Sequence, residues 1–430
     1  MQVFDRTRGL AGLIVLGLVV AVTAQIDAKS PSKDWPQFRG VNRNGLSLES
    51  GIKKSWPDAG PKELWRRPIG GGFSGISIVG DRGYTMYGSP VAEASQEEGA
   101  EKPETADYAA AFNAKTGEEI WRVKVGERFD DGFAHGPRST PTVDSDQVFV
   151  LGGRGYLMSL SKSDGSEQWS VDLKETFGSR LPTFGFSTSV LVDGDQVFLE
   201  SGGPDGNAYA ALDRKTGETR WTLGDAPENG PGYSSPIVIR KGGETRYVHV
   251  LGDKLTCMDD KGKEIWSHAW PSPGETHGSP IFLAPNRIYA SGAGGVGAAV
   301  FEVDEKSAPA KVEEIWKSRF MRNHFSSSVA SDGYIYGFDN ATLRCISAET
   351  GESVWAKRGF GKGSLILADG HLLVLSDRGV LALIEATHEG YVEKGRVQAL
   401  NGRSWTAPSL ADGKLYLRNS EEMVAYDLKN

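Results

Sequence analysis

The sequence predicts an all-β fold, an eight-bladed β-propeller built from four-stranded antiparallel blades. The first observation is an internal repeat: a phrase of Gly, three residues and Trp recurs at intervals of about 40–50 residues, a period typical of propellers. The second is a turn-rich composition, with 55 glycines in 430 residues and short runs that alternate with period two. The third is that the N-terminal part has one strand without a blade, and the C-terminal part has a blade that lacks one strand. The five full copies of the phrase are Gly117–Trp121, Gly165–Trp169, Gly217–Trp221, Gly262–Trp266 and Gly351–Trp355.

The first element, residues 1–24, has the features of a secretory signal peptide. Two arginines precede an apolar run from Leu10 to Val22, and small residues follow it. The run is short for a helix that spans a bilayer, so we expect cleavage, after Ala24 or after Ala28. We therefore expect an exported protein of the periplasm or cell envelope, soluble after cleavage and without a transmembrane segment in the mature chain. No Cys lies directly after the apolar run, so no lipid anchor is expected.

Residues 25–62 are rich in Pro, Gly and polar residues, and we expect an extended N-terminal arm. Residues 63–69 then look like the fourth strand of a blade, but no repeat precedes them. Residues 405–427 supply three strands and stop where a fourth is due. We predict that the N-terminal strand joins the C-terminal blade, because closing the ring removes open sheet edges. Residues 63–430 thus form a single propeller domain.

The tryptophans of the repeat are predicted to be structural. Each lies in the fourth strand of its blade, where a large ring can pack between neighbouring sheets, and the same residue recurs around the ring. The blade near Val397 has lost its Trp, and the first blade carries an acidic insertion, residues 88–106, which we expect to be a mobile loop. The predicted blade-docking residues are Trp65, Trp121, Trp169, Trp221, Trp266, Trp316 and Trp355.

Charge and cysteine content narrow the function classes. A formal net charge of −8 gives no reason to expect nucleic acid or an anionic membrane surface as a partner. Cys257 and Cys345 occupy nearly the same repeat position in blades that are not adjacent, so we expect two buried free thiols, not a disulfide. No Ser-His-Asp order and no pair of carboxylates with hydrolase spacing is evident, and we assign no catalytic residue.

A ring of large side chains is predicted at one mouth of the central channel. Each innermost strand follows a short phrase rich in Ser and Thr, and the residue before the phrase defines the ring. Such a ring either plugs the channel and stabilises the inner strands or holds a planar or anionic ligand. His277 and His324 lie one residue out of phase, so no metal site is expected. The eight positions are Phe73, Arg138, Phe186, Tyr233, His277, Phe325, Lys362 and Trp405.

The fuller copies of the repeat, Ala/Leu-Asp-x-x-Thr-Gly-x-x-x-Trp, resemble the quinoprotein-type (PQQ-like) propeller repeat over residues 63–427. That superfamily has two functionally different branches. One contains the PQQ-dependent alcohol and sugar dehydrogenases, which hold a quinone between a Trp and a ring of two adjacent disulfide-linked cysteines, with Ca²⁺ at the quinone edge. The other contains the non-catalytic scaffold subunit of the outer-membrane β-barrel assembly machinery.

The resemblance to the second branch is the better match. The chain has no adjacent cysteines, no Cys-x-x-Cys-His haem motif and no cluster of carboxylates in the segments that would face the channel. We expect a monomeric, non-catalytic binding or scaffold protein without a cofactor, whose partner is a cell-envelope protein or a small planar or anionic ligand. The alternative is a PQQ-dependent alcohol or sugar dehydrogenase with PQQ and Ca²⁺, and a third option is a propeller that binds carbohydrate or peptide.

Overall fold

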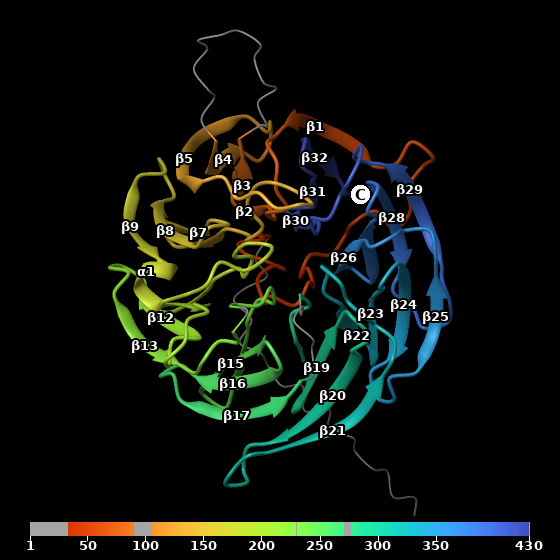
Figure 1. The fold of residues 1–430 in the computed structure, drawn as a ribbon. Helices are drawn as coiled ribbons and strands as arrows, with labels where there is room; N and C mark the ends of the chain where they lie inside the picture. The colour runs from red at the N-terminus through yellow and green to blue at the C-terminus, as the bar shows by residue number, and fades with distance from the viewer. Residues whose placement is uncertain (1–32, 90–104, 229, 271–276, 430) are drawn as a thin grey trace, which may run out of the picture.

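The computed structural model describes residues 33–89, 105–228, 230–270 and 277–429. Its strands form eight four-stranded antiparallel sheets around a central channel (Figure 1). The predicted eight-bladed propeller is therefore confirmed. The predicted signal peptide, residues 1–24, and most of the predicted insertion, residues 90–104, lie outside the described residues.

The strands of the first four blades run in chain order from the channel outwards. Blades 1 and 2 consist of β2 (Ser77–Val79), β3 (Arg82–Gly88), β4 (Ala106–Asn113) and β5 (Glu119–Glu127), and of β6 (Thr142–Asp144), β7 (Gln147–Leu151), β8 (Tyr156–Ser161) and β9 (Glu167–Asp172). Blades 3 and 4 consist of β10 (Leu191–Asp193), β11 (Gln196–Glu200), β12 (Tyr209–Asp213) and β13 (Thr219–Leu223), and of β14 (Ile237–Lys241), β15 (Glu244–Leu251), β16 (Lys254–Asp259) and β17 (Glu264–Ala269).

The remaining blades repeat this order except the last, whose outer strand comes from the N-terminus. Blades 5 and 6 consist of β18 (Ile281–Leu283), β19 (Arg287–Gly292), β20 (Gly297–Asp304) and β21 (Lys311–Ser318), and of β22 (Val329–Ser331), β23 (Tyr334–Asp339), β24 (Thr342–Ser347) and β25 (Ser353–Lys357). Blades 7 and 8 consist of β26 (Ser364–Ala368), β27 (His371–Leu375), β28 (Val380–Glu385) and β29 (Glu393–Gln398), and of β30 (Ser409–Ala411), β31 (Lys414–Arg418), β32 (Glu422–Asp427) and β1 (Lys62–Pro68).

The ring closes through an antiparallel pair between β1 and β32, as predicted. The pair runs from Lys62 opposite Asp427 to Pro68 opposite Glu422. An ion pair of 2.6 Å between Arg66 and Glu422 reinforces it. The N-terminal strand thus removes the free edge that blade 8 would otherwise expose.

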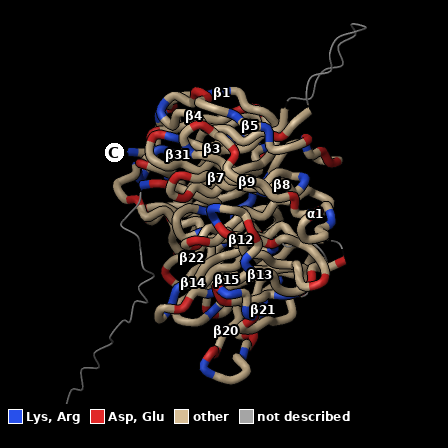
Figure 2. The backbone as a smooth tube through the Cα atoms, turned by 90° about the vertical axis from the view of Figure 1, so that its left-hand side faces the viewer, with Lys and Arg blue, Asp and Glu red and all other residues tan. Residues whose placement is uncertain are grey.

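One short helix, α1 (Leu173–Phe177), follows β9 and is the only helix in the described part of the chain. In those same residues no helix has the length and apolar character needed to cross a membrane. On the side shown in Figure 2, basic and acidic residues are interspersed along the backbone.

The repeat tryptophans join each blade to the next. Trp121 packs on Gly165, where an added Cβ atom would lie 2.8 Å from the indole, and Gly165 has a φ of +77° that disfavours other residues. The same contact recurs elsewhere in the ring and includes the closing strand, where Trp65 packs on Gly117. Five indoles also donate a hydrogen bond to a backbone carbonyl of the next blade: Trp65, Trp169, Trp221, Trp316 and Trp355.

The two cysteines are buried and free, as predicted. Cys257 lies opposite Trp266, and Cys345 lies opposite Trp355. The two thiols therefore occupy the same position in blades 4 and 6, where a small side chain makes room for the indole.

Blade 7 lacks its own Trp. In the other blades the Trp follows a bulge in the outer strand, as in the shift between Cys345–Trp355 and Ile346–Ser353. The corresponding residue of β29 is Gly395, opposite Leu383, and not Val397. The backbone and Cβ atom of Trp56, in the N-terminal arm, lie against Gly395. Trp56 is 8% exposed and belongs to the core cluster against which Val397 packs. The arm thus covers the position at which blade 7 lacks a Trp.

Candidate functional site

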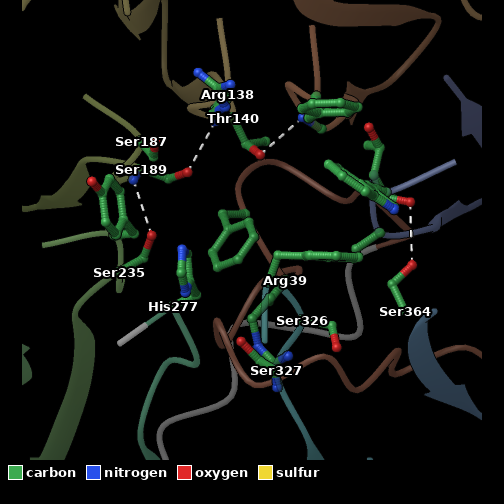
Figure 3. Close-up of a pocket in the computed structure, with 18 of the residues that line it drawn as sticks. Arg39, Arg138, Thr140, Ser187, Ser189, Ser235, His277, Ser326, Ser327 and Ser364 are labelled. Carbon is green, nitrogen blue, oxygen red and sulfur yellow. Dashed lines mark hydrogen bonds between the residues drawn. The ribbon is translucent and has the colours of Figure 1, made fainter. Parts of the chain in front are cut away.

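The central channel contains a cavity of about 420 Å³ (Figure 3). Its floor is formed by the N-terminal arm, its walls by the hydroxyl-rich phrases before the inner strands, and its mouth by aromatic and basic side chains. A volume of this size suits a small organic ligand.

The arm crosses the channel and closes one end of it. Its backbone pairs with Ile78 of blade 1 and Leu367 of blade 7. Arg39 donates to the carbonyls of Asn44 and Ser328, so the floor is anchored to blade 6. Trp35, Phe38 and Arg39 face the cavity.

A second arginine of the arm lies deeper. Arg43 is 1% exposed and donates to the carbonyls of Ser189, Val190 and Pro236 in blades 3 and 4. Within the described residues, neither Arg39 nor Arg43 has an ion-pair partner. Burial lowers the pKa of both guanidinium groups to about 9, so both stay charged at neutral pH. The floor is therefore cationic and held by carbonyl oxygens.

The walls carry a belt of hydroxyl groups that links neighbouring blades. The backbone N–H of Thr140 donates to Ser189 Oγ at 2.9 Å, and the N–H of Ser189 donates to Ser235 Oγ at 3.0 Å (Figure 3). A hydrogen bond of the same kind, from a backbone N–H to a side-chain hydroxyl oxygen, joins Gly75 to Thr140, Ser235 to Ser279 and Ser279 to Ser327. The belt spans blades 1–6. In blades 7 and 8 the wall includes the hydroxyl residues Ser364, Thr406 and Ser409 and also the apolar residues Leu365, Ala407 and Pro408.

Seven of the eight residues expected at the mouth line the cavity: Phe73, Arg138, Tyr233, His277, Phe325, Lys362 and Trp405. Phe186 does not. It is 2% exposed and packs in the core between blades 2 and 3, against Gly155. The phrase of blade 3 has three consecutive hydroxyl residues, which made its register ambiguous. Ser189 is the belt member, so the position equivalent to Tyr233 is Ser187, and the aromatic ring at the mouth comes from Phe184.

The mouth side chains form a nearly continuous chain of ring contacts. Tyr233 stacks on His277 with centroids 4.8 Å apart, and His277 stacks on His324 at 5.7 Å. Phe325, Trp405 and Phe73 continue the series at 4.6 and 5.1 Å. Sequence reasoning placed His324 near the mouth but gave no sign of Phe184 or Phe133, because neither belongs to the repeated phrase.

The charge around the cavity is positive. The charge of Arg138 is balanced by an ion pair with Asp131 at 2.5 Å, whereas Lys362 has no ion pair within the described part of the chain. No Asp or Glu of that part lines the cavity. Burial lowers the pKa of His277 to about 3 and also lowers that of His324, so both imidazoles are neutral at neutral pH. In the described residues no group of three or more His, Cys, Asp or Glu side chains is placed to hold a metal ion.

A loop between β5 and β6 covers part of the mouth. Asp131 Oδ1 accepts from the N–H groups of Phe133 and Ala134, and Arg403 of blade 8 donates to the Phe133 carbonyl at 2.7 Å. The Phe133 side chain nevertheless remains 65% exposed. The loop is thus fixed at both sides of the mouth while presenting an aromatic ring to solvent.

The family of the chain follows from its repeats. The PQQ_2 family model, described as "Outer membrane protein assembly factor BamB", matches residues 106–357 and 306–430. The chain belongs to this family. Its similarity to BamB proteins of known sequence is low but extensive. It is 22% identical to BamB of Yersinia pestis over 316 residues and 24% identical to BamB of Escherichia coli over 324 residues, each match covering 70% of this chain and 76% of the relative.

Solved structures share the fold with this BamB-family chain. BamB of Moraxella catarrhalis superposes with a TM-score of 0.57 at 14% identity, covering 86% of this chain and 99% of that one. The quinohemoprotein alcohol dehydrogenase of Comamonas testosteroni gives 0.62 at 14% identity, covering 93% and 81%. The propeller geometry is therefore common to the BamB protein and the dehydrogenase, and the distinction between them depends on the residues of the channel.

Proposed function

We propose that this protein is a non-catalytic binding and scaffold protein that acts in protein assembly in the cell envelope. The observation that carries the proposal is its membership of the BamB family, with relatives named as outer membrane assembly factors aligned over 76% of their own length. In such a role the propeller offers a rigid surface and needs no reaction centre.

The mouth loop supports this proposal, because it presents a contact that binding would bury. Phe133 is the most exposed of the large hydrophobic side chains in the described residues, at 65%. Its backbone is fixed by Asp131 and Arg403, so little conformational entropy is lost when a partner covers the ring. Aromatic residues of this kind often dominate binding energy at protein interfaces.

Affinity capture from the cell envelope of the natural host tests the proposal. We expect the mature protein to enrich outer-membrane β-barrel proteins or their assembly factors, identified by mass spectrometry, and the Phe133→Asp variant to recover them at least about tenfold less well. Ile120→Asp is the matched control, since Ile120 is 45% exposed but lies on outer strand β5. Equal capture by both variants, or no enrichment of envelope proteins, would contradict the proposal.

The rival function is a PQQ-dependent dehydrogenase, and the cavity residues fit it poorly. Calcium at a quinone needs six to eight oxygen ligands, usually including carboxylates. The described lining has no carboxylate and places Arg39 and Lys362 around the cavity. The two thiols are buried in blades 4 and 6, away from the lining. Titration with PQQ and Ca²⁺, with an assay of dye reduction by alcohols and sugars, tests this alternative: saturable binding with turnover would overturn the scaffold proposal.

A further inference from the structure

We propose that the arm-closed channel is a binding site for a small planar monoanion, of the class of aryl carboxylates. Its negative group would meet the hydroxyl belt and the cations, and its ring would pack among the mouth aromatics. This inference goes beyond the proposed scaffold function and does not depend on it: Phe133 lines the same cavity, but binding of a small ligand is measured separately from capture of a protein partner.

The hydroxyl belt supplies hydrogen-bond donors without acceptors. Ser189, Ser235 and Ser327 each use an oxygen lone pair to accept a backbone N–H from the preceding blade, at distances of 2.9 to 3.0 Å. No group of the described residues accepts the protons of these hydroxyls, and all three line the cavity. A hydroxyl has one proton to donate, and leaving it unpaired in a confined space costs free energy. The complement of this wall is a ligand rich in acceptors.

The charge distribution selects an anion among such ligands. Arg39 is 5% exposed and bonds only to carbonyl oxygens within the described chain. Lys362 also faces the cavity without an ion pair there, and the described lining contains no carboxylate. Two positive charges in a partly desolvated space therefore lack counter-charges, and a carboxylate would satisfy both Coulomb attraction and hydrogen bonding.

The aromatic side chains of the mouth select a ligand with a planar body. Leu365, Ala407 and Pro408 add apolar surface to the lining in blades 7 and 8, beside the hydroxyl residues Ser364, Thr406 and Ser409, and the rings of Phe325 and Trp405 line the mouth. The neutral imidazoles of His277 and His324 add stacked faces without adding charge. A ligand with hydrogen-bond acceptors at one end and an aromatic face at the other matches the hydroxyl belt and the aromatic mouth.

Thr406 gives an independent indication of a ligand. Its side chain is 3% exposed and lines the cavity, and its Oγ1 atom has no hydrogen-bond partner. Buried hydroxyls of this kind are normally paired, so Thr406 leaves one hydroxyl group at the cavity wall that no described residue satisfies.

Binding of 2-naphthoate to the mature protein, measured by calorimetry and ligand fluorescence, tests the inference, with neutral 2-naphthamide as the matched compound. We expect saturable one-to-one binding of the carboxylate and at least about tenfold weaker binding of the amide. Lys362→Gln is expected to weaken naphthoate binding about tenfold, whereas Lys317→Gln, which removes the same charge from outer strand β21, leaves it unchanged.

Thr406→Val keeps the inference testable if a charge change disturbs the fold. The hydroxyl has no partner to lose, so the variant should melt at or above the temperature of the original protein and bind naphthoate several-fold more weakly. Absence of saturable binding up to millimolar naphthoate, equal affinity for the amide, or equal effects of the Lys362 and Lys317 changes would overturn the inference and leave the cavity filled by water only.

Discussion

At the scale of single residues, two titratable side chains are sealed between blades 3 and 4. Glu200 of β11 and His249 of β15 are both 0% exposed, with Oε2 and Nε2 3.7 Å apart. Burial raises the pKa of Glu200 to about 8 and lowers that of His249 to about 4. His249 Nε2 pairs with the Ser234 carbonyl, and Tyr209 and Arg43 also face this pair. Both groups are therefore neutral at pH 7.

This burial makes stability depend on pH. Unfolded Glu200 loses its proton near its ordinary pKa of 4.5, whereas the folded protein keeps it up to about pH 8, so the free energy of unfolding falls as pH rises through that window. Glu200→Gln abolishes the titration and preserves the shape. Urea unfolding measures the free energy of unfolding of both proteins at pH 5 and pH 8. From pH 5 to pH 8 the stability of the variant relative to the original protein should rise by more than about 1.4 kcal/mol, which is the value of one pKa unit. Parallel changes in both proteins would contradict the pKa assignment. The titration of His249 changes the free energy of unfolding equally in both proteins, so it cancels in the comparison.

At the scale of strands and blades, the Trp contacts are expected to dominate the stability of each blade interface. Trp355 is 9% exposed and donates to the Thr387 carbonyl of blade 7 at 2.8 Å. Trp355→Ala should lower the free energy of unfolding by about 3–5 kcal/mol, because it opens a cavity and orphans a carbonyl. Its neighbour Val354 is 41% exposed, and Val354→Ala should cost less than about 1 kcal/mol. Chemical denaturation midpoints check both, and equal costs would refute the role assigned to the indole.

The sequence was sufficient to predict the blades, because each element of the repeat follows from local turn chemistry and alternation. It was insufficient where a contact joins segments without a repeat. Trp56 lies in the arm and fills the place beside Gly395, more than 300 residues away, so no local pattern relates them. Phe186 was misplaced for a related reason, since three adjacent hydroxyl residues fit the phrase in more than one register and only the bonds between blades select one.

At the scale of the whole molecule, the arm acts as an internal tie across the ring. It bonds to residues just before the inner strands of blades 3, 4 and 6, namely Ser189, Pro236 and Ser328, which lie more than 140 residues from the arm in sequence. The floor of the candidate site could not be predicted from sequence for this reason, whereas most of its mouth could. The basic residues of the arm gave no indication that they would be buried.

Removing the central contact of this tie should destabilise the entire ring. Arg43→Met retains the apolar stem but removes the donor to the carbonyls of Ser189 and Pro236 and one of the two donors to that of Val190, which should cost about 3 kcal/mol or more. Arg358→Met, at an exposed loop residue, is the control and should have little effect. Thermal unfolding and limited proteolysis of the arm check the prediction. If Arg43→Met were as stable and as resistant as the control, the arm would not hold the blades together.

The closing strand affects how the chain folds during its synthesis. Residues 62–68 are made early, yet their partners in β32 end at Asp427, close to the end of the chain. Because synthesis proceeds from the N-terminus, β1 has to wait without its partner while seven blades form. Such long-range pairing is slow, and an unpaired edge attracts other strands in the meantime. Loss of the last few dozen residues should therefore yield an open, aggregation-prone chain and not a slightly smaller propeller.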